Sequence, residues 1–428
     1  MLKEIIFQHK REKELFLSKE YILREKLDFA KKFLKTDLIK VITGPRRAGK
    51  SVFAILLLKD QDFAYLNFDD ENLLKINNSD EIVKGIFEVY GKTKFILFDE
   101  IQNLKNWEFF VNKLQRRGFN LIITGSNSKL LSKELATTLT GRHVSIEILP
   151  FSFKEILKAN QINLRPDKII IPEDRGILLN LLNKYLNDGG FPEIVVKDLE
   201  TKTYLDTLLD AILLKDVVKR YKVRFSQKIY ELFLYLISNF DREFTFNKLK
   251  NNLNFNSVNT IQNYLSYLKE AYLVFTLNRF SFKIKEQIKT AKKVYLVDNG
   301  FVLAKSFQFS GDFGRLMENL VFVELLKQGL KPNENIFYYQ TRNQKEVDFL
   351  IKEGIKIKNL IQVVYNFSDL EVKKREIKSL VEASQELNCD NLTIISWDQE
   401  GEELFKGKKI KIIPLWRWLL IFSRDINL

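Results

Sequence analysis

A glycine-rich segment near the N-terminus combines residue types and a spacing that suit phosphate binding. Its residues are Gly44, Pro45, Arg46, Arg47, Ala48, Gly49, Lys50 and Ser51, and Val52 continues into a helical pattern. Glycines allow backbone N–H groups to wrap a phosphate, and the start of the following helix adds partial positive charge. The segment matches GxxxxGK[ST] between an apolar strand and a helix, which predicts a P-loop that binds ATP. Lys50 is expected to reach the β- and γ-phosphates, and Ser51 to supply an oxygen to Mg²⁺.

A pair of acidic residues follows another apolar run and predicts the second half of the same site. Phe95–Phe98 form a buried strand, and Asp99 and Glu100 stand at its carboxyl end, where open α/β sheets place their ligands. We expect Asp99 to hold Mg²⁺ through water and Glu100 to be the general base for the attacking water. The acidic cluster 69–71 also follows a strand. We favour Asp99 and Glu100 because their strand is better formed and lies beyond an intervening strand, 63–68.

Three further polar residues are weaker candidates for catalysis. Ser126 and Asn127 end the apolar run 121–124 and could orient the water beside the γ-phosphate, although an ordinary turn explains them nearly as well. Arg142 precedes the next strand and could reach a neighbouring subunit's γ-phosphate as an arginine finger, or be a surface arginine. Arg46 and Arg47 could contact phosphate or a lid.

The elements that must position these residues alternate along the chain. Short apolar runs at 38–43, 63–68, 94–98, 121–124 and 144–149 are separated by helical stretches, which predicts an α/β fold with a parallel sheet. Residues 1–36 have the pattern of one amphipathic helix. We divide the chain into that segment, an ATPase core, a helical lid, a middle module and a C-terminal domain, at 1–36, 37–154, 155–225, 226–309 and 310–428.

Several longer motifs resemble those of one protein family. They are GPRRAGKS, FDEIQNLKNWE, ITGSNSKLLSKEL with TGR, LPFSFKEIL, YLNDGGFPE, GRLMENLVFVELL and EVDFLI, and they are spread over nearly the whole chain. Together they resemble the predicted archaeal and bacterial ATPases of the AAA+ superfamily that carry a C-terminal domain of unknown function. The resemblance implies a central P-loop strand, a helical lid after Phe151, and Ser126 and Asn127 at the sensor position. It does not imply a defined cellular role.

The middle module has the pattern of a winged helix, with helices at 228–240, from 244 and from 257, and paired strands at 274–282 and 293–297. Between residues 242 and 293 there are ten basic and three acidic residues, and this surplus of seven is half of the net charge of +14. Such a surface suits DNA phosphates, although winged helices also serve as packing modules between subunits. The candidate DNA-binding residues are Lys248, Lys250, Asn259, Gln262, Asn263, Lys283 and Lys285.

The C-terminal domain resembles the restriction-endonuclease-like core, in which an Asp and a Glu on adjacent strands hold Mg²⁺ and a nearby Lys activates water. Glu318 on a helix and Asp348 on a strand suit that site. Gln362 stands where the Glu is needed and Val364 where the Lys is needed. Because amide is a poorer ligand for a hard cation and valine cannot polarise water, we expect the fold to be kept and nuclease activity to be lost.

The composition of the chain excludes some classes of protein. The single cysteine, Cys389, excludes an internal disulfide and a cysteine-based zinc site, and the N-terminus lacks a signal-peptide pattern. We therefore expect a cytoplasmic homo-oligomer that uses ATP and Mg²⁺, contacts DNA and does not enter a membrane. Two alternatives remain: a slow nucleotide-controlled switch that docks a protein partner, and an ATP-regulated metal-dependent nuclease.

Overall fold

The computed structural model describes residues 2–76, 78–127, 141–162, 172–197, 199–305 and 312–425. Its chain forms two compact units. The first contains Met1–Phe151 and Glu270–Tyr272, and the second contains Ser152–Lys269 and Leu273–Leu428.

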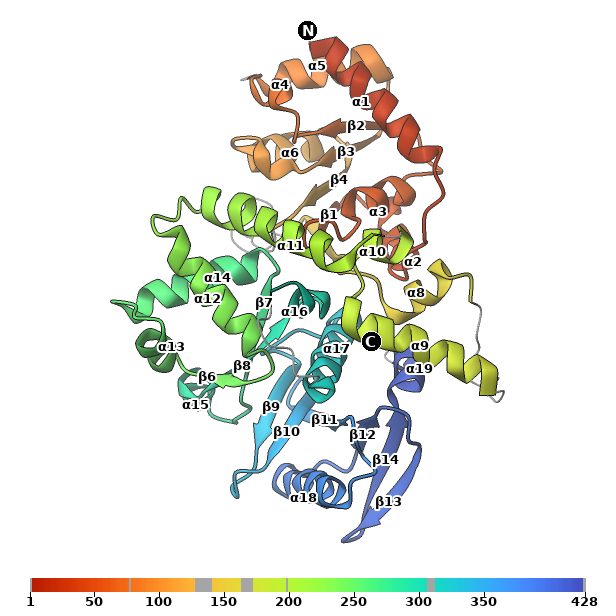
Figure 1. Ribbon diagram of the computed structural model, residues 1–428. Coiled ribbons are helices and arrows are strands. Elements are labelled where there is room, and N and C mark those ends of the chain that lie inside the picture. The colour runs from red at the N-terminus through yellow and green to blue at the C-terminus, as the bar shows by residue number, and fades with distance from the viewer. Residues whose placement is uncertain are drawn as a thin grey trace. The chain divides into compact units, whose positions relative to one another are not determined.

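The first unit is built on a five-stranded parallel sheet (Figure 1). Its strands are β1 (Ile39–Thr43), β2 (Phe63–Asn67), β3 (Phe95–Asp99), β4 (Asn120–Gly125) and β5 (His143–Glu147). They lie in the order β2-β3-β4-β1-β5, and every pair is parallel. The predicted α/β fold with a parallel sheet is confirmed. A parallel sheet is buried on both faces, which is why its strands are nearly continuous apolar runs.

The order of the strands corrects two expectations about the sheet. The strand at 63–68 was expected between the P-loop strand and the strand of Asp99, but β2 lies on the outer edge, and β4 separates β1 from β3. The P-loop strand β1 is interior, with β4 and β5 beside it, whereas β4 occupies the middle of the sheet. A strand's place in the sequence does not determine its place in a parallel sheet, because the crossover helices allow strands to be skipped.

Helices cover both faces of this sheet. They are α1 (Leu2–Leu17), α2 (Leu27–Lys31), η1 (Lys32–Lys35), α3 (Lys50–Leu57), α4 (Glu71–Leu74), α5 (Ser79–Tyr90), η2 (Ile101–Asn103) and α6 (Trp107–Arg116). Buried side chains of α1, α5 and α6 pack into one apolar cluster with the strands. Those of α2 and α3 pack into another cluster.

The N-terminal segment is not the single helix that its apolar pattern predicted. The helix α1 ends at Leu17, and residues 18–26 have no regular helix before α2. This stretch bonds to the sheet instead: Arg24 donates to the carbonyl oxygen of Ala48 at 2.8 Å, and Lys26 to that of Glu147 at 2.9 Å. These hydrogen bonds to backbone carbonyls explain why the chain leaves the helical path here.

The second unit begins with helices. They are α8 (Phe153–Ala159), α9 (Pro172–Asp188), α10 (Pro192–Val196), α11 (Thr201–Ala211) and the π-helix η4 (Ile212–Lys219). The predicted boundary at 154/155 falls inside α8, which Ser152 and Glu155 begin with a capping box. The predicted boundary at 309/310 and most of the SNSKLLSKEL motif lie outside the described residues.

The middle of the chain contains the three expected helices and the two expected strands, and adds β6, α15 and α16 to them. The elements are α12 (Ser226–Ser238), β6 (Glu243–Phe244), α13 (Phe246–Asn252), α14 (Val258–Glu270), β7 (Val274–Asn278), α15 (Ile284–Lys289), β8 (Lys292–Leu296) and α16 (Gly300–Lys305). The strands form a small antiparallel sheet in the order β6-β8-β7. The strand predicted at 274–282 ends at Asn278, and the short helix α15 lies between β7 and β8.

The C-terminal part forms a six-stranded mixed sheet in the order β13-β14-β12-β11-β10-β9 (Figure 1). Its elements are α17 (Phe313–Lys327), β9 (Ile336–Gln340), β10 (Glu346–Glu353), β11 (Lys356–Val364), α18 (Leu370–Leu387), β12 (Leu392–Ser396), β13 (Gly401–Phe405), β14 (Lys408–Pro414) and α19 (Leu415–Asp425). In α19, Trp416 and Trp418 are both buried, as expected for a packed helix. No helix in the described residues is long and apolar enough to cross a membrane.

Candidate active site

The glycine-rich loop connects β1 to α3 with two glycines in conformations that other residues rarely adopt. Gly44 has φ +146°, and a Cβ atom there would lie 1.9 Å from the carbonyl oxygen of Ile148. Gly49 has φ +89° and directly precedes the first residue of α3. A side chain at Gly44 would therefore force the loop away from β5, and Gly49 allows the tight entry into the helix.

The two functional side chains of the loop meet the residues at the end of β3. Lys50 is buried, donates to the carbonyl oxygen of Pro45 at 3.0 Å, and lies 3.8 Å from a carboxylate oxygen of Glu100. Ser51 donates from its hydroxyl to Asp99 Oδ1 at 2.9 Å. The structure thus brings together four predicted residues from two distant sequence motifs.

Asp99 is a buried carboxylate surrounded by hydroxyl groups. Besides Ser51, the hydroxyl of Thr124 donates to Oδ1, and that of Tyr65 donates to Oδ2 at 3.3 Å. Burial, together with the neighbouring charge of Glu100, raises the pKa of Asp99 to about 6. A carboxylate in this state is stabilised by a nearby cation, and carboxylate and hydroxyl oxygens are ligands that Mg²⁺ prefers. Ser51 and Asp99 therefore fit the expected Mg²⁺.

Glu100 is held in an uncommon backbone conformation beside Asp99. Its φ is +49°, in the left-handed region. Its N–H donates to the Thr124 hydroxyl at 3.0 Å, and the side-chain amide of Gln102 donates to its carboxylate. Non-glycine residues in this region often occur at functional sites, where surrounding contacts maintain the strained geometry. In this geometry the Glu100 carboxylate lies 3.8 Å from the Lys50 ammonium.

The other acidic cluster has structural partners. Asp70 accepts the backbone N–H of Asn72 at 2.8 Å and begins α4 as its N-cap. Asp69 accepts the side-chain amide of Asn103 at 2.8 Å. Because this cluster follows the edge strand β2, it lies one strand further from the P-loop than Asp99 does.

The weaker candidates fall in two different places. Ser126 and Asn127 are buried at the carboxyl end of β4, whose Gly125 pairs with Thr43 at the end of β1. Arg142 precedes the amino end of β5: its carbonyl accepts the N–H of Ile39, and its guanidinium donates to Asn112 at 3.2 Å. In a parallel sheet this is the edge opposite the P-loop, so Arg142 does not reach the ATP site of its own chain.

Two residues that sequence reasoning overlooked support the site. Thr124 contacts both Asp99 and the backbone of Glu100, and Arg24 binds the carbonyl oxygen of Ala48 within the loop. Thr124 ends an apolar strand, and a polar residue at that place was a usable signal. Nothing in the local sequence around Arg24 indicates its partner.

The predicted nuclease-like residues lie in a second cluster of buried charges. Lys293 on β8 lies 2.8 Å from a carboxylate oxygen of Glu318, 3.2 Å from Asp241 and 2.6 Å from Glu346. Burial alone would raise the pKa of Glu318, but the charge of Lys293 and hydrogen bonds, including those from Asp241 and Tyr295, hold it below its ordinary value. Lys293 is itself buried, so it does not contribute to the basic surface of the middle module as the charge count had assumed.

The side chains of Asp348 and Gln362 are hydrogen-bonded to each other in the C-terminal part. The Gln362 amide nitrogen lies 3.3 Å from Asp348 Oδ1 and 2.6 Å from a carboxylate oxygen of Glu376. The N–H of Val363 donates to Asp348 Oδ2 at 2.7 Å. In the described part of the chain no group of three His, Cys, Asp or Glu residues is arranged to hold a metal ion.

The predicted DNA-binding residues lie mostly on the surface. Exposed side chains are those of Lys248, Asn259, Gln262, Asn263, Lys283 and Lys285, while Lys250 is half-buried. Ile261, Leu265 and Leu268 of α14 are buried. The helix therefore keeps its polar face toward solvent.

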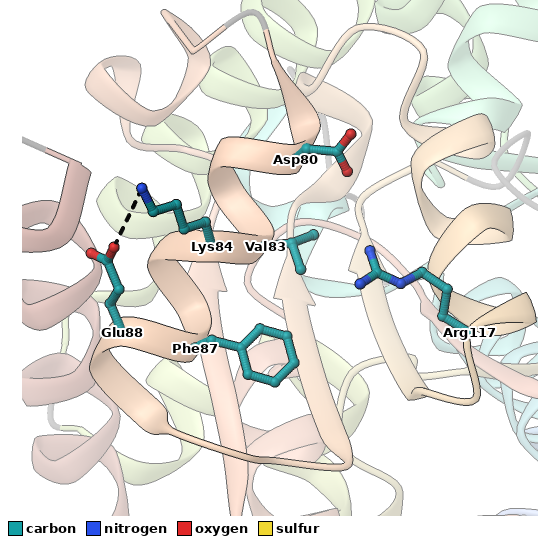
Figure 2. Close-up of a pocket in the computed structure, with 6 residues that line it drawn as sticks. All are labelled: Asp80, Val83, Lys84, Phe87, Glu88 and Arg117. Carbon is teal, nitrogen blue, oxygen red and sulfur yellow. Dashed lines mark ion pairs between the residues drawn. The ribbon is translucent and has the colours of Figure 1, made fainter.

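A surface pocket on the first unit is separate from these groups. Figure 2 shows its lining on α5 and just after α6, formed by Asp80, Val83, Lys84, Phe87, Glu88 and Arg117. Lys84 and Glu88 lie 3.9 Å apart across one turn of α5. None of the predicted site residues lines this pocket.

Comparison with known proteins agrees with the geometry. The family model described as an AAA domain matches residues 36–157, and two domains of unknown function, DUF8612 and DUF4143, match residues 179–310 and 313–418. The parallel sheet and the P-loop lie within the segment that the AAA-domain model matches, so residues 36–157 have the fold of a P-loop ATPase domain.

Two relatives cover nearly the same length. An uncharacterised protein of Methanocaldococcus jannaschii is 40% identical over 94% of this chain and 95% of its own. An uncharacterised protein of Haemophilus influenzae is 32% identical over 80% of this chain and 86% of its own. The chain therefore belongs to the same protein family as these two relatives. Among solved structures, the Walker-type ATPase of Pyrococcus abyssi matches with a TM-score of 0.43 and 14% identity over 66% of this chain and 95% of its own.

Proposed function

We propose that the protein is a Mg²⁺-dependent ATP hydrolase whose turnover is coupled to DNA binding. The observation that carries the first part is the 2.9 Å hydrogen bond from Ser51 to Asp99, with Lys50 and Glu100 directly beside it. Ser51 would supply an oxygen to the metal and Asp99 would hold it through water, while Lys50 and the loop backbone would bind the phosphates. Mg²⁺, when bound, would neutralise negative charge on the phosphates.

Glu100 is the proposed general base. Its carboxylate accepts a proton from the attacking water, which must approach the γ-phosphate in line with the leaving oxygen. The 3.8 Å separation from Lys50 supports this role because Lys50 binds the same phosphate. Ser126 and Asn127, at the end of the strand between the two motifs, would orient that water.

The DNA-binding part of the proposal rests on the middle module, interpreted as a winged helix. Three helices and a small antiparallel sheet follow in the order such a module requires, and α14 occupies the place of the recognition helix. Its exposed Asn259, Gln262 and Asn263 would face the groove, with Lys248, Lys250, Lys283 and Lys285 near the phosphates. Arg142, which lies away from its own ATP site, would act on the site of a neighbouring copy in a homo-oligomer.

The C-terminal domain is proposed to keep a restriction-endonuclease-like fold without nuclease activity. The ammonium of Lys293 already neutralises Glu318, and Asp348 already accepts hydrogen bonds from Gln362 and Val363. A catalytic metal would have to displace these internal partners. DNA cleavage with Mg²⁺ or Mn²⁺ that disappears in Asp348→Ala would contradict this assignment.

One experiment tests the main proposal. Phosphate release from ATP is measured without DNA and with single-stranded, duplex and forked DNA at low salt, and the mass of the protein is measured with and without ATP. We expect turnover that DNA stimulates and a larger assembly with ATP. Absence of turnover under every condition contradicts the hydrolase, and turnover that is slow and indifferent to DNA favours a nucleotide-controlled switch.

A further inference from the structure

One tyrosine of the P-loop unit comes from a distant part of the chain. Tyr272 belongs to the first compact unit together with Glu270 and Ala271. The residues on either side, up to Lys269 and from Leu273 onward, belong to the second unit. The side chain of Tyr272 is 1% exposed, and its φ is +59°, in the left-handed region. Bulky residues rarely adopt this conformation, and it persists only where surrounding contacts fix the residue. The turn after α14 therefore holds the Tyr272 ring in a defined place within this unit.

The hydroxyl of Tyr272 contacts the strand that leads into the P-loop. It donates to Thr43 Oγ1 at 3.1 Å in a fully buried environment. Thr43 is the last residue of β1 and directly precedes Gly44. The side chain of Glu147, which pairs with Thr43 across the β1–β5 register, also takes part in a hydrogen bond with the Tyr272 hydroxyl. Burial raises the pKa of both Glu147 and Tyr272.

The backbone at Thr43 and Gly44 is closely packed and cannot shift freely. Its carbonyl oxygen accepts the N–H of Ile148 at 2.7 Å, and a Cβ atom on Gly44 would lie 1.9 Å from the carbonyl oxygen of Ile148. The first peptide of the P-loop is therefore packed directly against the chain that follows β5. A change in the orientation of Thr43 would be passed to Gly44, because close-packed groups cannot shift independently.

We propose that Tyr272 is a positioning residue for the ATP site, acting through Thr43 to fix the start of the P-loop against β5. Tyr272 lies two residues after the end of α14, so the helix proposed to contact DNA is joined by a short segment to the P-loop strand. This second part rests on the proposed DNA contact. The route by which a change at α14 would alter ATP turnover consists of the two residues after Glu270 and the hydrogen bond from Tyr272 to Thr43.

Removal of single hydroxyl groups tests the first part without DNA. Binding of the fluorescent analogue mant-ATP and phosphate release from ATP are measured for Tyr272→Phe, Thr43→Val and the double variant. Loss of one net hydrogen bond predicts that each single variant weakens binding or slows turnover roughly three- to tenfold. The double variant should lose no more than Tyr272→Phe alone, because that substitution already removes the hydrogen bond with Thr43 together with the one with Glu147. Thr43→Ser keeps the hydroxyl and should behave as the wild type does.

Tyr267→Phe is the matched control. Tyr267 lies on α14, and its ring stacks on Tyr221 with 4.0 Å between ring centroids, so the substitution removes a hydroxyl and keeps the ring. Its binding and turnover should equal those of the wild type. The positioning role is overturned if Tyr272→Phe binds and turns over ATP as the wild type does. It is also overturned if the effects of the two substitutions multiply in the double variant. The same holds if the loss of activity is no larger than the unfolded fraction measured by thermal melting.

The proposed link between α14 and ATP turnover is tested in a separate experiment with DNA. If duplex DNA stimulates the wild type, Tyr272→Phe should be stimulated at least several-fold less, and equal stimulation would overturn the link through α14. If DNA does not stimulate the wild type, the proposed DNA contact fails and this link fails with it. The DNA-free comparison of Tyr272 with Thr43 still decides the positioning role in that case.

Discussion

The protein buries carboxylates at the end of β3 and between β8, β10 and α17, and it gives them different partners. Asp99 accepts from hydroxyl groups, which carry no charge, and its pKa rises to about 6. Glu318 lies 2.8 Å from the ammonium of Lys293, and its pKa falls below the ordinary value. The difference teaches that burial alone does not mark a metal site. Glu318 is in direct contact with an ammonium group of the chain, whereas the charge of Lys50 only partly offsets the effect of burial on Asp99.

The largest expected effect comes from removing that internal cation. Lys293→Met leaves Glu318, Asp241 and Glu346 without their ammonium partner. Breaking a buried ion pair in this way typically costs about 3–5 kcal/mol of stability. The thermal transition of the second unit should move down strongly at pH 7 and recover in part toward pH 4, where the carboxylates take up protons. Lys292→Met, which removes contacts with the side chain of Asn278 and the carbonyl oxygen of Ile288 but no ion pair with a buried carboxylate, is the control. Equal losses in both variants would show that Lys293 has no special role.

At the ATP site the largest effect is expected from Lys50→Ala. The change removes the charge that binds the phosphates, and we expect mant-ATP binding or turnover to fall by about a hundred- to a thousandfold. Fluorescence titration and phosphate release measure the two quantities. Lys84→Ala on α5 is the matched control, because that side chain is 78% exposed and pairs only weakly with Glu88. Normal turnover in Lys50→Ala would remove the loop from the active site.

Glu100→Gln separates binding from chemistry. The amide cannot accept the water's proton, so turnover should fall by about a hundredfold or more while ATP stays bound. Single-turnover assays with labelled ATP distinguish the bound from the cleaved nucleotide. Asp69→Asn changes the competing acidic cluster and should leave turnover near the wild-type level. Rapid cleavage in Glu100→Gln would assign the base to another residue.

A third buried carboxylate, that of Asp298, can be compared with Asp99 and Glu318, and a smaller effect is expected from its substitution. Asp298 accepts the backbone N–H groups of Gly190 and Gly300 at 2.8 and 2.9 Å, and burial raises its pKa to about 6. Its folded form binds a proton more readily than the unfolded chain, so its contribution to stability is lost as pH rises from about 4 through 6. Asp298→Asn removes this dependence, which amounts to about 2–3 kcal/mol.

Melting temperatures of wild type and Asp298→Asn at pH 4 and pH 7 measure this effect. The melting temperature of the wild type minus that of Asp298→Asn should be larger at pH 4 than at pH 7. Asp390→Asn, at a carboxylate that is 79% exposed, should show little pH dependence relative to the wild type. Identical pH profiles for wild type and Asp298→Asn would mean that Asp298 is not protonated in the folded protein at pH 4–6.

The sequence predicted most of the first unit because its signals are local. Each of the five strands is an apolar run, and the P-loop follows one of them directly. The order of those strands was not predictable, since β4 enters between β1 and β3 only through long crossovers. Lys293 shows the same limit. It was counted as surface charge because its partners Glu318 and Glu346 come from later elements, and no local pattern records such a pairing.

The pairing of Lys293 with Glu318 also bears on how such chains can recombine. Lys293 lies in the segment that one family model matches, at 179–310, and Glu318 lies in the segment that the next one matches, at 313–418. A gene rearrangement that exchanged the last segment alone would bring a buried glutamate without its lysine, or leave a buried lysine without its glutamate. The two segments are therefore expected to be inherited together, and a homologue that has lost one of these charges should have lost the other.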